Sequence, residues 1–524
     1  MLNLFLRFNF HKLLHSRFPS TASLPELCVR RERDCNVSRL TQDDSQMAIP
    51  ALPTDIILII FKYIGVKDLM RLRQTCKDFL EITQLRSVWQ ELLQTEVIQR
   101  NIPIPHLAGR DLAALTSKEL ESSLSDALRL RKNWISPSPV PRRRLTFKTV
   151  HQPQSQIVSV AFLPGREHRR LMSLALTTGG QRLFTLQCWD LTDCTCVAQR
   201  SLPDFRGFRI NTESSHPAVL ALRSTIGIEI LGLDLSGSST PDSAFITLQV
   251  LDNVPDSLHI FSASTLLTKL GESRINLRTI EKPDFHVELR NPDYIVQKDC
   301  IDALLTDKYA VVVRTVALEL YSLSSFRDGS ADQIIEPICA HTWQWRVDSV
   351  SLAYQPSWEA AARALDPPIN ILVRYASLFP WPVNALHHYV LPSDASYNPR
   401  DNIDANNKPY LPEAVLIRTF ASPIRLFARW DMVLGSYGTA LWIDSHTEDY
   451  FDHAVEGQRL AGTLFTVVEP GEPVVALNDQ TATATASMVY QVREDDGWVR
   501  IAIEEEEGKI AVGTSTAEIT IFDY

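Results

Sequence analysis

Apolar residues recur at helical spacing between residues 52 and 95. Residues 52–65 (LPTDIILIIFKYIG) begin with Leu-Pro, carry Thr54 and Asp55 as possible N-cap residues, and end at Gly65, which suits a left-handed helix end. One predicted helix face is formed by Ile56, Ile57, Ile60, Phe61 and Ile64. The next two segments continue the spacing with Leu69, Leu72, Cys76, Phe79, Trp89, Leu92 and Leu93. These short helices hold more apolar residues than they can bury among themselves, which predicts a partner.

A longer helix is predicted after a turn-rich segment, NIPIPHLAGRD. Thr116 and Glu119 have the spacing of a capping box, and Leu115 and Leu120 that of a hydrophobic staple across it. The helix ends near Trp134 and is expected to pack as a spacer between the first helices and the remainder of the chain. The segment ISPSPVPRRR then interrupts the helix with three prolines. We expect this Pro-rich linker to isolate the helices from the C-terminal part of the protein.

From about residue 145 the helical period gives way to short β-branched runs bounded by Gly, Asp and Ser, which predicts an all-β domain. The runs come in pairs, each a strand, a small-residue turn and a second strand that ends in an apolar or aromatic residue. Five such pairs stand out: residues 171–191, 217–235, 308–323, 431–444 and 509–524. Repetition of this kind indicates a repeat architecture.

The spacing of the pairs indicates which repeat this is. Asp190 and Asp234 lie 44 residues apart, and the later pairs fit multiples of a period in the low forties. This period resembles the blades of WD-repeat β-propellers, and Trp189-Asp190 matches the dipeptide of that family. The Gly-His half of the signature is absent almost everywhere, so the blades are degenerate; about seven are expected, with six or eight left open. Because the chain ends on a strand at Tyr524, we expect residues 144–150 to supply the missing outer strand.

The helical segment also resembles a known family. Leu52-Pro53, Asp55-Ile56, Ile60, Asp68-Leu69, Leu72-Arg73, Thr75-Cys76-Lys77, Phe79 and Trp89 resemble the F-box in order and spacing. The resemblance implies a three-helix module that docks on a Skp-family adaptor and, through it, on the cullin of a ubiquitin ligase. The adaptor-binding residues that it implies are Leu52, Pro53, Ile56, Ile57, Ile60, Leu69, Leu72, Cys76, Phe79 and Trp89. The alternative is a small helical bundle that merely packs on the rest of the protein.

We therefore predict a multidomain protein, with a small all-α F-box module and an all-β propeller of about seven degenerate blades. The expected parts are a leader (1–46), the F-box (47–95), a helical spacer (96–134), a Pro-rich linker (135–143) and the propeller (144–524). The leader is basic before Glu26 and has the composition of a mitochondrial transit peptide, but Met47 follows it. A disordered or artefactual extension is favoured over import.

The charge is unevenly placed along the chain. Residues 1–150 hold 23 Lys and Arg against 15 Asp and Glu, whereas the remainder holds 29 against 47. The acidic body argues against a nucleic-acid partner, and the basic first part suits an acidic adaptor. No segment approaches the length of a membrane span. Eight scattered cysteines fit reduced thiols, which suggests a cytoplasmic or nuclear protein.

Candidate chemistry is sparse, and we expect no cofactor, no metal site and no catalytic activity. Cys188, Cys194 and Cys196 lack the spacing of a metal knuckle, and His387 and His388 are neighbours in a predicted strand. The acidic run 504–507 before Gly508 is interpreted as a strand-to-strand turn. The leading hypothesis is a substrate receptor of a Skp–cullin–F-box ligase, with an unknown protein substrate on the propeller. The alternatives are an interaction scaffold uncoupled from degradation and an enzyme in the central channel.

Overall fold

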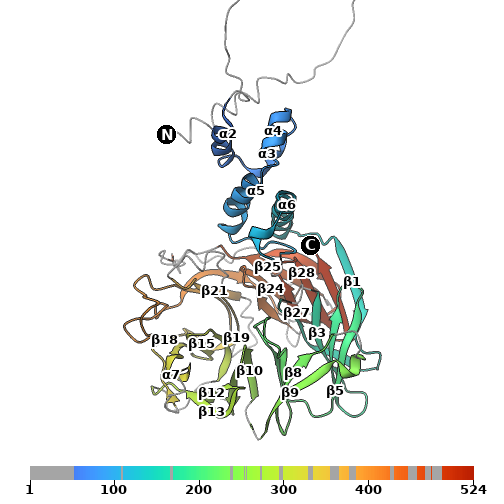
Figure 1. The fold of residues 1–524 in the computed structure, drawn as a ribbon. Coiled ribbons are helices and arrows are strands. Elements are labelled where there is room, and N and C mark those ends of the chain that lie inside the picture. Colours follow the sequence, from blue (N-terminus) through green and yellow to red (C-terminus); the bar gives the residue numbers. More distant parts are fainter. Residues whose placement is uncertain are drawn as a thin grey trace, which may run out of the picture. The chain divides into compact units, whose positions relative to one another are not determined.

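The computed structural model describes residues 52–107, 110–165, 169–235, 240–252, 254, 257–271, 274–293, 299–327, 334–354, 365–376, 385–424, 430–445, 457–466, 474 and 487–524. Pro53–Tyr524 forms one compact unit (Figure 1). The predicted leader, residues 1–46, lies outside the described residues. Among the described helices, none is long and apolar enough to cross a membrane.

Four short helices begin the described chain: α2 (Thr54–Phe61), α3 (Val66–Leu72), α4 (Lys77–Ile82) and α5 (Arg86–Leu93), which continues into the π-helical turn η2 (Gln94–Ile98). Two details of their ends differ from the sequence prediction. Pro53 is the N-cap of α2, and no side chain caps this end. Gly65 has a φ of −66° and is the extended N-cap of α3, so it does not end α2 in the left-handed region.

The predicted spacer helix is confirmed as α6 (Ser117–Trp134), which follows the 3-10 turn η3 (Leu112–Ala114). Thr116 and Glu119 form the expected capping box, in which the Glu119 carboxylate accepts the Thr116 N–H over 2.9 Å. The two staple residues, Leu115 and Leu120, are both buried. The cap satisfies backbone groups that would otherwise lack partners and fixes where this 18-residue helix starts.

The remaining described residues form seven sheets, antiparallel apart from one short added strand, which are the blades of a β-propeller (Figure 1). Blades one to three are β2 (Ser155–Phe162), β3 (Arg170–Thr177), β4 (Leu183–Asp190) and β5 (Thr195–Leu202); β6 (Gly207–Ile210), β7 (Leu220–Arg223), β8 (Gly227–Leu233) and β9 (Phe245–Asp252); and β10 (Ser257–Ser262), β11 (Thr265–Leu270), β12 (Arg274–Thr279) and β13 (Lys282–Leu289). The short helix η4 (Pro241–Ser243) precedes β9.

Blades four to six are β14 (Cys300–Leu305), β15 (Tyr309–Arg314), β16 (Ala317–Ser322) and β18 (Cys339–Thr342); β19 (Val347–Tyr354), β20 (Ile369–Tyr375), β21 (Ala385–Leu391) and β22 (Val415–Ala421); and β23 (Met432–Leu434), β24 (Thr439–Ser445), β25 (Gln458–Leu464) and β26 (Met488–Arg493). Between β16 and β18 lie α7 (Ser324–Arg327) and β17 (Ile334–Ile335). The strand β17 pairs with β13 and makes blade three five-stranded.

Blade seven combines both ends of the propeller sequence. It contains β27 (Trp498–Glu504), β28 (Lys509–Thr514) and β29 (Glu518–Asp523), with β1 (Arg143–Lys148) as its outer strand. The strands β1 and β29 pair antiparallel from Arg143 opposite Asp523 to Lys148 opposite Glu518. This pairing confirms both the expected closure and the central estimate of seven blades.

The Trp189-Asp190 dipeptide makes two contacts within blade one. Trp189 donates its indole N–H to Ser173 Oγ over 2.9 Å, and Asp190 forms an ion pair with Arg170 at 2.6 Å. Both contacts join β4 to β3. The signature therefore marks a cross-strand link in blade one, where the sequence retains it most fully.

The Pro-rich segment does not isolate the helices from the propeller, so that expectation is wrong. The Asn133 side chain accepts the Val140 N–H and donates to the Val140 carbonyl, which folds residues 135–140 back on the end of α6. Val489 donates its N–H to the Pro137 carbonyl over 3.0 Å, so the segment also contacts β26. Three prolines stiffen this connection, and these three hydrogen bonds hold it in place.

Candidate protein-interaction site

The first four helices share a small apolar core. Its buried side chains are Ile57, Phe61, Leu69, Phe79, Val88, Trp89, Leu92 and Leu93. The Phe61 and Phe79 ring centroids lie 6.2 Å apart, and Trp89 donates its indole N–H to the Thr83 carbonyl over 2.7 Å. A buried indole with its N–H satisfied anchors the end of α4 to α5. The helices thus fold around a defined core of their own.

The ten residues that the F-box resemblance implied as adaptor contacts divide into three groups. Four are buried inside the helical core: Ile57, Leu69, Phe79 and Trp89. Four are half-buried: Leu52, Ile60, Leu72 and Cys76. Two are exposed: Pro53 and Ile56. The buried group builds the module, and only the other residues have surface to offer a partner.

Exposed apolar side chains add to this surface, and among them only Ile56 was predicted as a contact from the sequence. Ile56, Ile59 and Tyr63 are 40%, 51% and 69% exposed and lie on one side of α2 and its end, at i, i+3 and i+7. Leu80 on α4 is 41% exposed. We call Ile56, Ile59, Tyr63 and Leu80 the α2–α4 apolar surface. These large exposed apolar groups on short helices are the candidate contact residues for another protein.

The helical core is joined to α6 by polar contacts. Arg73 donates two hydrogen bonds to the Glu121 carboxylate, at 2.6 and 3.0 Å, and lies over the Trp89 ring at 5.5 Å. Arg86 donates to three carbonyls of the segment before α6: Leu112, Ala113 and Leu115. Both arginines are half-buried, and a bidentate guanidinium–carboxylate pair fixes orientation as well as distance.

The other end of α6 is joined to blades six and seven. Trp134 donates its indole N–H to Thr439 Oγ1 over 2.9 Å, and its carbonyl accepts from the Tyr490 hydroxyl over 3.1 Å. The Trp134 ring meets the Tyr490 and Tyr524 rings edge-on at 5.4 Å each. Gly508, with a φ of +64°, lies under α6, where an added Cβ would overlap the Leu130 side chain. The left-handed φ favours glycine at this turn.

The acidic run 504–507 forms the predicted turn between β27 and β28. Glu505 accepts the Tyr437 N–H over 2.6 Å and the Thr439 N–H over 2.8 Å, and burial raises its pKa to about 7. Glu507 accepts the His106 N–H over 2.7 Å and lies 3.0 Å from His106 Nδ1. The turn therefore holds the sixth blade with one carboxylate and the segment before α6 with another.

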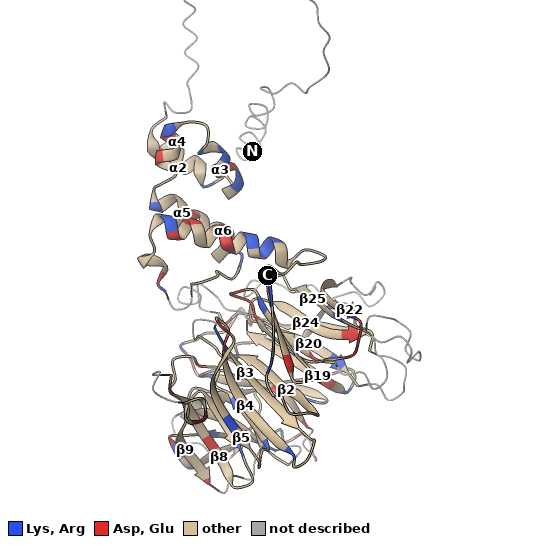
Figure 2. Cartoon of the chain, turned by 90° about the vertical axis from the view of Figure 1, so that its right-hand side faces the viewer, with Lys and Arg blue, Asp and Glu red and all other residues tan. Residues whose placement is uncertain are grey.

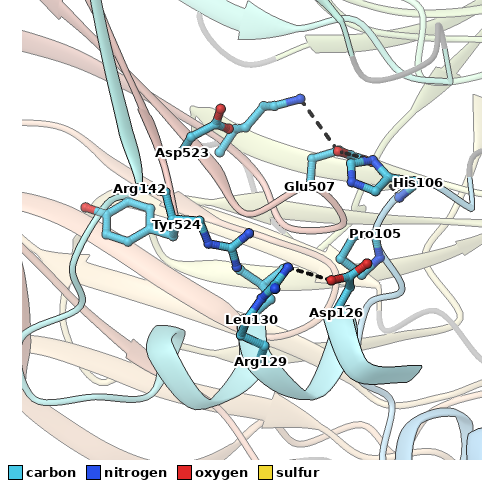
Figure 3. Close-up of a pocket in the computed structure, with 10 residues that line it drawn as sticks. Pro105, His106, Asp126, Arg129, Leu130, Arg142, Glu507, Asp523 and Tyr524 are labelled. Carbon is cyan, nitrogen blue, oxygen red and sulfur yellow. Dashed lines mark hydrogen bonds and ion pairs between the residues drawn. The ribbon is translucent and has the colours of Figure 1, made fainter. Parts of the chain in front are cut away.

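A cavity of about 260 Å³ lies beside this turn (Figure 3). Arg129 in its wall pairs with Asp126, and Glu507 pairs with Lys509. These two ion pairs neutralise part of the charge in the lining. The cavity belongs to the junction between α6 and the propeller, and its lining residues are Pro105, His106, Asp126, Arg129, Leu130, Arg142, Glu507, Lys509, Asp523 and Tyr524.

The two neighbouring histidines considered for chemistry, His387 and His388, have packing roles. His387 contacts the Tyr375 ring, whereas His388 bonds Asn370 over 2.9 Å and stacks on Phe465. Burial lowers the pKa of His387 to about 4 and that of His388 to about 3, so both are neutral near pH 7. In the described part of the chain, no three His, Cys, Asp or Glu side chains gather as a metal site.

One pair that the sequence did not suggest lies on the inner strands of blades three and four. Cys300 Sγ is 3.4 Å from His259 Nε2. Burial raises the pKa of the Cys300 thiol to about 12 and lowers that of His259 to about 4. Burial thus favours the neutral thiol and the neutral imidazole at this pair.

Comparison with known proteins bears on the first helices. A family model described as F-box-like matches residues 49–95. Residues 49–95 form an F-box-like domain. Such domains generally bind Skp-type adaptor proteins, and joining one to a propeller is typical of non-catalytic adaptors with a substrate-receptor or interaction role.

Similarity over the whole chain is weak. No curated protein matches the sequence significantly. Among solved structures, the β-propeller domain of Myceliophteria thermophila Cps50 (Swd1) aligns with a TM-score of 0.41 and 12% identity, covering 73% of this chain and 100% of that one.

Proposed function

We propose that this protein is a substrate receptor of a Skp–cullin–F-box ubiquitin ligase. In this proposal the F-box-like domain binds a Skp-family adaptor, the adaptor binds the cullin, and the propeller holds the target protein. The observation that carries the proposal is the F-box-like match at residues 49–95 together with the α2–α4 apolar surface, which the described part of the chain leaves exposed.

The proposed mechanism is proximity. A receptor raises the effective concentration of a target lysine near the ubiquitin carried by the ligase, without itself reacting. The contacts of α6 support this role because they limit the freedom between the adaptor-binding helices and the propeller. Arg73–Glu121 secures one end of α6, and Trp134 secures the other. A stiffer connection loses less effective concentration than a flexible one.

Co-purification tests the proposal. The full chain should bring down a Skp-family adaptor and a cullin from cells. Ile56→Ala combined with Tyr63→Ala should weaken adaptor binding at least tenfold, because each removes a large exposed apolar contact and 1.4 kcal/mol corresponds to tenfold. Ile226→Ala is the matched control, since Ile226 is 72% exposed but lies between β7 and β8.

A second measurement separates a ligase receptor from an interaction scaffold. Proteins captured by the propeller should remain bound to the Ile56→Ala/Tyr63→Ala chain but lose ubiquitination and live longer in cells. Failure of the unaltered chain to bind the adaptor would contradict the proposal at its first step. Adaptor binding without any change in the lifetime of a captured protein would support the scaffold instead.

A further inference from the structure

The outer strand of blade seven carries a run of exposed cations. Arg142, which precedes β1, and Arg143, Arg144 and Lys148 within it are all exposed. We call these four residues the basic edge. None of them forms an ion pair with another described residue, and Lys148 remains unpaired although Glu518 lies opposite it in β29. Figure 2 shows further Lys and Arg on the C-terminal half of α6.

A cation on the neighbouring blade is arranged differently. Arg200 on the outer strand of blade one is neutralised by Glu229 at 2.9 Å, and the chain beyond residue 150 carries more acidic than basic residues. The basic edge is therefore a concentrated positive region on an otherwise acidic propeller. Such a region attracts a negatively charged partner.

The backbone of β1 is also open on its outer side. Thr149 donates its N–H to the Ala517 carbonyl over 2.9 Å, so residue 149 faces β29. Hydrogen-bonded and non-hydrogen-bonded pairs alternate in an antiparallel ladder, which turns the backbone groups of Arg144, Thr146 and Lys148 away from β29. The ladder from residue 143 to 148 has no bulge. An extended chain can pair with these outward groups.

Blade three shows that an outer strand of this propeller accepts a fifth strand. There β17 pairs parallel with β13, with Ile334 opposite Glu288 and Ile335 opposite Leu289. The added strand comes from a distant part of the same chain, between β16 and β18 of blade four. The sheet geometry of blade three thus accommodates an additional extended segment at its outer edge.

We propose that β1 is a docking strand for an extended acidic segment of a partner protein, which joins blade seven as a fifth strand. Main-chain hydrogen bonds to β1 supply affinity, and side chains two residues apart supply specificity. Arg144 and Lys148 lie four residues apart on one face of β1, with Thr146 between them. The segment therefore carries carboxylates at alternate positions on that face and no proline at the pairing residues. This inference goes beyond the ligase proposal and does not depend on it.

Peptide binding to the full chain tests the inference. The probe is a fluorescent twelve-residue peptide of alternating threonine and glutamate, and its binding is followed by fluorescence anisotropy at low and high salt. It should bind the unaltered chain, more weakly at high salt because screening reduces exposed charge interactions. The same peptide with lysine in place of glutamate should bind at least tenfold more weakly.

Variants of the chain separate the two components of binding. Arg144→Glu with Lys148→Glu should weaken binding of the acidic peptide at least tenfold, because the charge of the basic edge is reversed. Thr146→Pro removes one outward N–H and should weaken peptide binding about tenfold. The strand β1 should stay paired with β29, since edge strands tolerate proline where the N–H faces solvent. The matched control is Arg274→Glu with Lys282→Glu, two exposed cations of blade three, which should bind as the unaltered chain does. Thermal melting confirms that each variant is folded.

Three results would overturn the inference. One is equal binding by the unaltered chain and the folded Arg144→Glu/Lys148→Glu variant. Another is loss of binding on charge reversal but none with Thr146→Pro, because the contact would then be electrostatic without strand pairing. The third is a single-stranded RNA of equal charge that binds the basic edge more tightly than the peptide, which would point to a nucleic-acid partner.

Discussion

The indole N–H of Trp134 donates to Thr439 Oγ1 over 2.9 Å, which links the last turn of α6 to the first residue of β24. Thr439 also donates its backbone N–H to Glu505 in blade seven. One residue of blade six therefore contacts both α6 and the neighbouring blade. The orientation of α6 and the packing of two blades depend on the same few contacts.

We expect Trp134→Ala to destabilise this junction by about 3 kcal/mol, because a large buried aromatic side chain and its hydrogen bond are lost. Thermal melting should show a lower transition, and limited proteolysis should cut faster within residues 135–141. Trp345→Ala is the control, since Trp345 is 63% exposed and should change neither measurement. Unchanged proteolysis in the Trp134 variant would mean that the helix is held by other contacts.

Much of the fold could be predicted from local patterns. The alternation of short strands and turns indicated the propeller, and the unpaired strand at Tyr524 indicated closure by β1, as the pairing of Leu145 with Ile521 shows. The connection after α6 was harder to predict. The three prolines of the predicted linker, residues 135–143, suggested an isolating connection, whereas its attachment depends on Asn133 and on Val489, some 350 residues later. Single-sequence patterns carry no signal for such distant pairing.

The candidate site could be located from the sequence but not divided into core and surface. The segment TDIILIIF is apolar on more than one face, so helical spacing alone does not tell which isoleucines face inward. Ile57 is 3% exposed, whereas Ile56 beside it is 40% exposed. The inward face of α2 is set by packing against later residues, as the contact between the Phe61 ring, one turn after Ile57, and the Phe79 ring of α4 shows.

Closure by β1 predicts a difference between prolines at adjacent positions. Leu145→Pro should lower the melting temperature of the propeller strongly, because residue 145 faces β29 in the ladder and loses a hydrogen bond there. Thr146→Pro should have a smaller effect, since its N–H faces away. Circular dichroism melting compares the two. Equal melting temperatures would contradict the register or the importance of β1 for closure.

Glu505 predicts a pH dependence of stability with a definite sign. Burial raises the pKa of Glu505 from 4.5 to about 7, so the folded protein holds a proton that the unfolded chain releases at lower pH. Its contribution is fully present below about pH 4.5 and is lost as the pH rises through about 7. The loss is on the order of 3 kcal/mol at 1.36 kcal/mol per pKa unit.

Glu505→Gln isolates this contribution from other titrating groups. At low pH Glu505 is a neutral carboxylic acid whose two oxygens can each still accept one N–H, whereas the amide NH2 of glutamine accepts none, so the variant should be less stable there. The difference in unfolding free energy between the two proteins should shrink between pH 5 and pH 8, because only the unaltered chain loses stability through this residue. Denaturant unfolding at several pH values measures it. A constant difference would show that Glu505 is already ionised at pH 5.

The division of the F-box-like domain into core and surface predicts that two similar substitutions affect different properties, one the stability of the helices and the other partner binding. Leu69 is fully buried, and Leu69→Ala should destabilise the first helices by roughly 2–5 kcal/mol. Ile59 is 51% exposed, and Ile59→Ala should change the stability of the first helices by less than about 0.5 kcal/mol. The same substitution should weaken the binding of a partner that covers α2. Hydrogen exchange of the α3 and α5 amides measures the first effect, and adaptor co-purification the second. Leu69→Ala also weakens co-purification if its helices open, so only the Ile59 variant separates binding from folding. Loss of protection at α5 in the Ile59 variant would place this side chain in the core and remove it from the α2–α4 apolar surface.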